Sequence, residues 1–195
     1  MNQKSINNII WEWTHKWLIG FRDITNSINE RTFIVSPIPD AFGVGNSATL
    51  LFVERGTMPG ALLLGMMSSL VFDYATRQKI GGSHASISFV KQFPVLTPEQ
   101  VSSSGYERDI VERVARLCWF NHDLDGWMEE LREEYDLPEE PVIWDKGQRA
   151  VWQAELDAIF AHLYGLTTED LRYILDPEDV CGKGCINETF RVLKE

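Results

Sequence analysis

The chain has 195 residues, 44% of them hydrophobic, and a formal net charge of −11 at pH 7. These values are typical of one globular domain with a hydrophobic core. The longest apolar stretch, 61–72, is interrupted and too short for a membrane span, which takes about 20 residues. No secretory signal pattern is present, and Cys118, Cys181 and Cys185 suit a reducing compartment. We therefore expect a cytoplasmic protein without a membrane partner.

The charge is unevenly distributed along the chain. Residues 1–100 contain eight Lys and Arg and seven Asp and Glu, whereas residues 101–195 contain ten Lys and Arg and 22 Asp and Glu. An acidic total argues against a nucleic-acid binder, but the first half could meet phosphates if its cations cluster. The second half would be repelled by DNA, so we expect it to face solvent or another protein.

The first 20 residues are rich in aromatic side chains, with Trp11, Trp13 and Trp17. They either pack on the domain's own sheet or form a surface that another domain covers. Two runs that follow, 32–36 and 48–53, predict strands, and the first should end at Pro37 because proline cannot continue a central strand.

The polar run 22–31 carries side chains that suit DNA contact. Arginine can pair with guanine and asparagine with adenine, while hydroxyl groups can bind phosphates. The alternative is a polar turn held by local side-chain hydrogen bonds. The candidates for DNA contact in this run are Arg22, Thr25, Asn26, Asn29 and Arg31.

The next predicted elements are a helix over 57–78, a glycine turn and a strand over 86–93. Apolar residues at helical spacing indicate one buried face, and Gly81 and Gly82 should end the helix. Cations gather around this turn, which predicts an anion or phosphate site; the alternative is a capped helix with solvated charges. The candidates here are Arg77, Lys79, Gly81, Gly82, Ser83, His84 and Lys91.

The remaining chain is predicted to be helical after an extended exit over 94–100. One amphipathic stretch, 106–135, should break near 121–126, and a second helix should cover 146–164 and end at Gly165. Its inward residues are expected to be Val151, Leu156, Ile159, Phe160 and Leu163. Thr168 is the expected N-cap of a short helix ending at 175. A zinc site at Cys181 and Cys185 would need distant ligands, so we expect plain thiols and no metal.

Three stretches together resemble one protein family. They are Arg-Gln-Lys-Ile-Gly-Gly-Ser-His at 77–84 followed by Phe-Val-Lys-Gln-Phe-Pro-Val-Leu at 89–96, the run 17–32, and the segment 155–177. In this order they are similar to the TaqI-like C-terminal specificity domain, which lies behind an adenine-specific methylase domain in restriction-modification and BREX-type phage-defence enzymes. The likeness covers most of the chain.

The resemblance implies a target-recognition region whose partners are double-stranded DNA and the methylase domain of the same parent chain, placed before Met1. The parent would use S-adenosylmethionine as its cofactor. This chain has neither a glycine-rich cofactor loop nor an Asn or Asp followed by Pro-Pro and an aromatic residue. We therefore expect no catalytic residue and no cofactor of its own, and the sequence leaves open whether the parent cleaves DNA.

These expectations combine into an α+β chain. An aromatic-rich segment, 1–19, precedes a small mixed sheet with one buried helix over 20–95, and a helical part fills 96–195. The main functional hypothesis is DNA target recognition for a methylase domain. The alternative is an acidic protein-interaction module that docks on a partner of a phage-defence complex, and a third possibility is a specificity domain that binds DNA only within its full enzyme.

Overall fold

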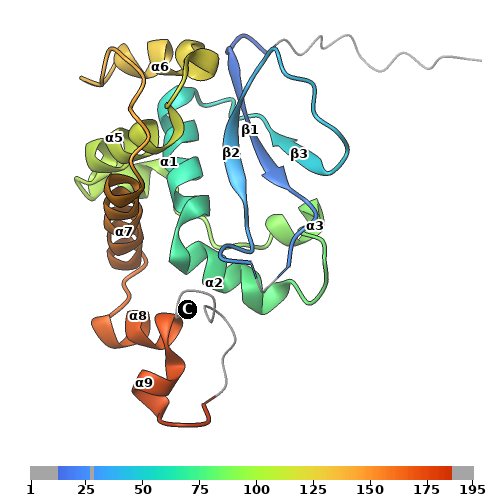
Figure 1. Cartoon of the computed structure of the whole chain (residues 1–195), viewed down its shortest axis with the longest axis vertical. Helices are drawn as coiled ribbons and strands as arrows, with labels where there is room; N and C mark the ends of the chain where they lie inside the picture. Colours follow the sequence, from blue (N-terminus) through green and yellow to red (C-terminus); the bar gives the residue numbers. More distant parts are fainter. Residues whose placement is uncertain (1–12, 27–28, 186–195) are drawn as a thin grey trace, which may run out of the picture.

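The computed structural model describes residues 13–26 and 29–185. Within these ranges the fold is α+β, as expected. A three-stranded sheet lies on one side of helix α1 (Thr57–Ser68), and helices α5 (Glu107–Cys118) and α7 (Lys146–Leu163) lie on its other side, α5 above α7 (Figure 1). The larger of two hydrophobic clusters in the described residues joins the sheet to α1, α5, α6 (Asp125–Arg132) and α7. The first part of the chain therefore shares its core with the helical part.

The sheet is antiparallel throughout, whereas a mixed sheet was expected. The central strand is β1 (Trp17–Arg22), which pairs with β2 (Val35–Pro39) on one side and β3 (Ala48–Leu51) on the other. The predicted end of the first run at Pro37 was wrong, because β2 is an edge strand and an edge tolerates proline. Trp17 is fully buried in the core, and Trp13 donates its indole N–H to the Trp17 carbonyl at 2.8 Å. Trp11 lies outside the described residues.

The helix expected over 57–78 is two helices, α1 (Thr57–Ser68) and α2 (Leu70–Lys79), which meet at a 64° bend. Ser69 causes the break, because its backbone is extended and its hydroxyl donates to the Met66 carbonyl at 2.7 Å and accepts from the Phe72 N–H at 3.3 Å. Within the described part of the chain no single helix is long and apolar enough to cross a membrane; α1 and α2 reach that length and composition only as a bent pair.

Helix α1 is the buried helix that the sequence predicts, and it is buried on two sides. It lies between the sheet and α5 (Glu107–Cys118) (Figure 1). Two glycines allow this close packing: a Cβ at Gly60 would overlap the Trp17 ring, and one at Gly65 would lie 2.8 Å from Val114 Cγ2. Larger residues at either position would push α1 away from its neighbours.

Helix α2 does not end through a glycine, as was expected. Ile80 closes it in an extended conformation, and neither Gly81 nor Gly82 has a positive φ. The predicted strand over 86–93 was also wrong: this segment forms α3 (Ile87–Val90). The Val90 N–H bonds to the Ser86 carbonyl at 3.1 Å. Val90 and Phe93 are buried, whereas Ile87 and Phe89, which a strand would bury together with Phe93, are exposed.

The helical part agrees more closely with its prediction. The break near 121–126 is confirmed, and Gly165, with φ +73°, ends the long helix as expected. Leu156 and Phe160 are buried, but Val151 is exposed because it lies on the outer face of its helix. The elements here are α4 (Pro98–Ser103), η1 (His122–Leu124), α6 (Asp125–Arg132), α7 (Lys146–Leu163), α8 (Thr168–Leu175) and α9 (Pro177–Cys181).

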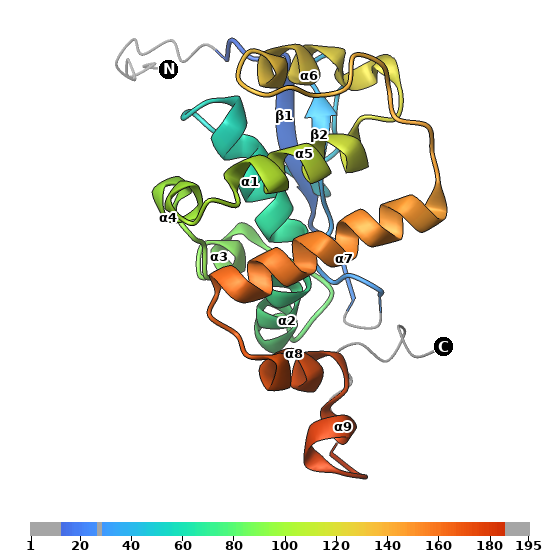
Figure 2. The same cartoon turned by 90° about the vertical axis from the view of Figure 1, so that its left-hand side faces the viewer.

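Side chains cap the N-terminal ends of helices in the helical part, including α4 and α8. Thr167, not Thr168, is the N-cap of α8, and it forms a reciprocal capping box with Asp170. Thr97 caps α4 in the same way with Gln100, so the predicted extended exit ends in a helix. Helices α8 and α9 lie beyond the end of α7 (Figure 2), where Ile174 packs against Leu70 of α2.

One carboxylate joins three elements of the fold. Glu130 of α6 lies 2.6 Å from His15 Nδ1, and it accepts hydrogen bonds from Trp17 Nε1 at 2.9 Å and from the Thr57 hydroxyl. Burial alone would raise the pKa of Glu130, but the hydrogen bonds from Thr57, Trp17 and His15 outweigh it and hold that pKa below its usual value. The ionised carboxylate therefore fixes α6 to β1 and to the start of α1.

Candidate nucleic-acid interface

Two polar segments that are far apart in the sequence meet at the end of β1. The Thr25 N–H donates to the Ser83 carbonyl at 2.9 Å, and the Ala85 N–H donates to the Asp23 carbonyl at 2.7 Å. This short antiparallel bridge places the polar run after β1 beside the turn after α2. Both segments were predicted to contact DNA, and their backbones are in direct contact.

The bridge borders an open groove of about 450 Å³. Five of the twelve predicted DNA-contact residues line this groove, together with two residues that the sequence did not single out. All seven lining residues are Arg22, Ile24, Thr25, Asn26, Asn29, Ser47 and Ser83.

The side chains of Arg22 and Asn29 face each other across this groove. With the Asn29 amide oriented so that its oxygen faces Arg22, it accepts from Arg22 Nη2 at 3.1 Å and from the Asn26 N–H at 3.3 Å. Thr25 is buried, and its hydroxyl donates to the Thr32 carbonyl, so it supports the loop. Arg22 and Asn26 are exposed. The groove therefore presents a guanidinium and two amides, which are groups that can read base edges.

His84 lies next to the groove but already has an acidic neighbour. Its Nδ1 is 2.8 Å from the Asp23 carboxylate. The ring is mostly exposed, so Nε2 is the nitrogen that remains available to a ligand. Asp23 was not among the predicted residues, and its carboxylate would repel a phosphate placed beside it.

Arg77 takes a structural role, contrary to the expected phosphate contact. Its side chain is only 4% exposed, and its Nε donates to Asp73 at 2.7 Å. Its Nη2 donates to the carbonyls of Asn29 and Glu30 at 2.8 and 2.9 Å. Asp73 in turn accepts the Phe33 N–H at 2.7 Å. We call Asp73 and Arg77 the loop clamp, because together they hold the segment that carries Asn29.

Arg31 also points away from the groove. It forms an ion pair with Asp157 of α7 at 3.1 Å, and Asp157 also accepts the Leu70 N–H at 2.6 Å. Burial raises the pKa of Asp157 to about 6, although the neighbouring Arg31 pulls it downward. The expected base contact of Arg31 is therefore replaced by a contact between the loop and the helical part.

The remaining candidates are exposed near the glycine turn. Lys79 ends α2, Lys91 follows α3, and Gly81 and Gly82 lie in the turn between these helices. Among residues 13–26 and 29–185, no carboxylate lies within 4 Å of either lysine ammonium group. These two lysines and the turn can therefore meet an anion without first breaking an ion pair.

Comparisons with protein-family models, with curated proteins and with solved structures found no match. The function of the chain is therefore inferred from the groove and from the sequence resemblance.

Proposed function

We propose that this chain is the DNA target-recognition region of an adenine-specific DNA methyltransferase of a restriction-modification or phage-defence system. One observation carries the proposal: two segments that were selected for their DNA-binding chemistry lie side by side and line one groove. In this proposal Arg22, Asn26 and Asn29 contact base edges. A methylase domain outside this chain would transfer the methyl group from S-adenosylmethionine.

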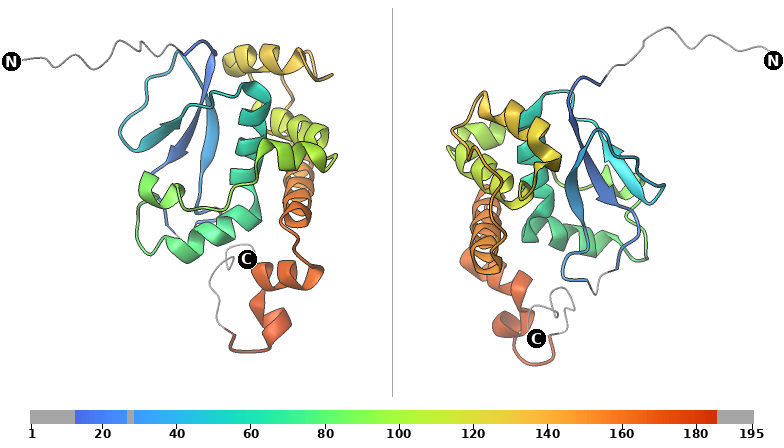
Figure 3. Two further views of the ribbon diagram at one scale, coloured as in Figure 1. Left: turned by 180° about the vertical axis from the view of Figure 1, so that it is seen from behind. Right: turned by 45° about the horizontal axis from the view of Figure 1, so that its top comes forward.

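The phosphate contacts belong to the exposed groups around the turn. Lys79 and Lys91 supply positive charge, and the exposed turn at Gly81 and Gly82 allows close approach of a backbone phosphate. Helices α5 and α7 each carry equal numbers of acidic and basic residues, whereas the segment 123–145 carries ten Asp and Glu and one Arg. This segment contains α6, which contacts the start of β1 through Glu130, at the opposite end of that strand from the groove (Figure 3). This separation supports the proposal, because it keeps much of the negative charge away from a duplex bound at the groove.

The proposal predicts different effects for base and phosphate contacts. Asn26→Ala should relax sequence preference at one position by about 1–3 kcal/mol in a selection from randomised duplexes. Lys91→Ala should weaken binding of the full chain almost equally on every duplex. Lys146→Ala, on the first turn of α7, is the control and should change neither property. An unchanged preference in Asn26→Ala together with unchanged affinity in Lys91→Ala would overturn the assignment.

One observation favours the alternative of a protein-interaction module. Ile143 is 89% exposed and Trp144 is 61% exposed, and both precede α7 in the acidic half of the chain. Exposed aromatic and aliphatic side chains of this kind are common at protein interfaces. If the alternative holds, Ile143→Ser should abolish pull-down of a partner while DNA affinity stays unchanged.

A further inference from the structure

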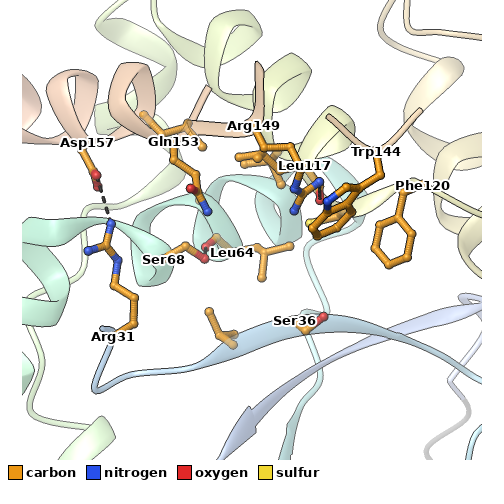
Figure 4. Close-up of a pocket in the computed structure, with 15 residues that line it drawn as sticks. Arg31, Ser36, Leu64, Ser68, Leu117, Phe120, Trp144, Arg149, Gln153 and Asp157 are labelled. Atoms are coloured by element: carbon orange, nitrogen blue, oxygen red, sulfur yellow. Dashed lines mark hydrogen bonds and ion pairs between the residues drawn. The ribbon is translucent and has the colours of Figure 1, made fainter. Parts of the chain in front are cut away.

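A cavity of about 320 Å³ lies between α7, α1, the end of α5 and β2 (Figure 4). Leu64, Val114, Leu117 and Leu156 give it apolar walls. The volume corresponds to about ten water molecules and falls at the small end of the range for ligand pockets, roughly 300–1,000 Å³. It therefore suits a small molecule and not a dinucleotide.

Arg149 places a positive charge at one end of this cavity. Its guanidinium lies 3.8 Å from the centre of the Trp144 ring, and its Nη1 donates to the Leu117 carbonyl at 2.8 Å. No carboxylate of the described residues lies within 4 Å of it. Burial lowers the pKa of Arg149, which still remains charged near neutrality. The cavity thus contains a partly desolvated guanidinium that lacks a counter-ion.

The opposite end of the cavity is electrically balanced. Arg31 and Asp157 form their ion pair there (Figure 4). Gln153 extends from α7 between the two ends, and its amide makes no hydrogen bond to the described residues that line the cavity. Phe120 meets the Trp144 ring edge-on at 5.4 Å, so an aromatic pair borders the mouth next to Arg149.

From this arrangement we propose that the cavity binds a small organic carboxylate with a flat apolar body. The carboxylate would accept hydrogen bonds from Arg149 and from the Gln153 amide, and the apolar body would pack between Leu64, Val114 and Leu156. A single negative charge fits best, because one guanidinium lacks a counter-ion and the Asp157 carboxylate would repel a second charge. This inference does not depend on DNA binding by the groove.

The probe for this site is 2-naphthoate, with 2-naphthamide as its neutral counterpart of nearly the same shape. Titration calorimetry on the full chain should show 2-naphthoate binding with a dissociation constant of about 1 mM or tighter. It should bind at least tenfold more tightly than 2-naphthamide, because only the carboxylate can pair with Arg149. Equal affinity for the two probes, or absence of 2-naphthoate binding at millimolar concentration, would overturn the proposal.

Variants locate the binding site within the chain. Arg149→Gln should weaken 2-naphthoate binding at least tenfold, Arg149→Lys should weaken it less, and Gln153→Trp should block it by filling the cavity. Lys146→Gln removes the same charge three residues away on the exposed start of α7 and should leave binding unchanged. Circular dichroism confirms that each variant is folded. Binding that survives both Arg149→Gln and Gln153→Trp in folded protein would show that this cavity is not the site.

Discussion

The loop clamp provides the sharpest test of how the fold positions the groove. Arg77→Ala would leave the Asp73 carboxylate buried without its cation, and it would remove the donor that serves the Asn29 and Glu30 carbonyls. Breaking a buried ion pair in this way costs about 3–5 kcal/mol. For a chain of this size that loss lowers the melting temperature by roughly 6–20 °C.

Urea unfolding followed by circular dichroism measures this loss directly. Lys79→Ala is the matched control, because it removes an exposed cation two residues away and should change stability by less than about 0.5 kcal/mol. Arg77→Lys should give an intermediate loss, since an ammonium group cannot reproduce the forked guanidinium contacts. If Arg77→Ala costs no more than Lys79→Ala, Arg77 is solvated and the clamp does not exist as described.

Three further predictions concern the core and its ionisable groups. Leu156→Ala should cost about 2–5 kcal/mol in urea unfolding, because Leu156 is buried beside α1 and α5; a loss under 0.5 kcal/mol would contradict its core position. Glu130→Ala should destabilise the chain by about 1–3 kcal/mol at pH 7, because buried donors lose their acceptor. The difference in stability from wild type should shrink at low pH, where Glu130 itself is protonated. Asp157 behaves oppositely, because its folded pKa of about 6 lies above the unfolded value of about 3.9. The folded chain therefore binds the proton more tightly than the unfolded chain does. The contribution of Asp157 to stability consequently falls as the pH rises from about 4 to 6. Asp157→Asn should remove this dependence, which amounts to about 3 kcal/mol, and an identical pH profile in both proteins would refute the raised pKa.

The sequence predicted the fold class and most helices because local signals fix them. Apolar spacing located α5 and α7, and Gly165 marked the end of α7. Local signals failed where tertiary contacts decide the structure. The segment 86–93 alternates like a strand, yet it pairs with none of the strands in the described residues and buries Val90 and Phe93 as a short helix. Ser69 divides the single helix that apolar spacing predicted over 57–78.

In the candidate site, too, local signals predicted some features and tertiary contacts decided the others. Residue chemistry was sufficient to select the two segments that border the groove, but it could not tell which cations are exposed. Arg77 looked like a surface cation, although Asp73 four residues earlier was a signal for an ion pair on one helix face. No local signal linked Arg31 to Asp157, because their contact depends on how α7 packs against the loop. Ser47 joins the groove because β3 pairs with β1, and the Asp23 N–H donates to the Ser47 carbonyl at 2.8 Å.

The salt dependence of DNA binding tests the central claim most directly. The slope of log affinity against log salt should be measured for the full chain, for the combined lysine variant Lys79→Gln and Lys91→Gln, and for a control with Arg108→Gln and Lys146→Gln. Each lost phosphate contact makes the slope shallower by about 0.9. The DNA-binding proposal predicts a slope that is shallower by about 1.8 for the lysine variant and unchanged for the control. Equal slopes for the two variants, or no binding to any duplex at low salt, would contradict it.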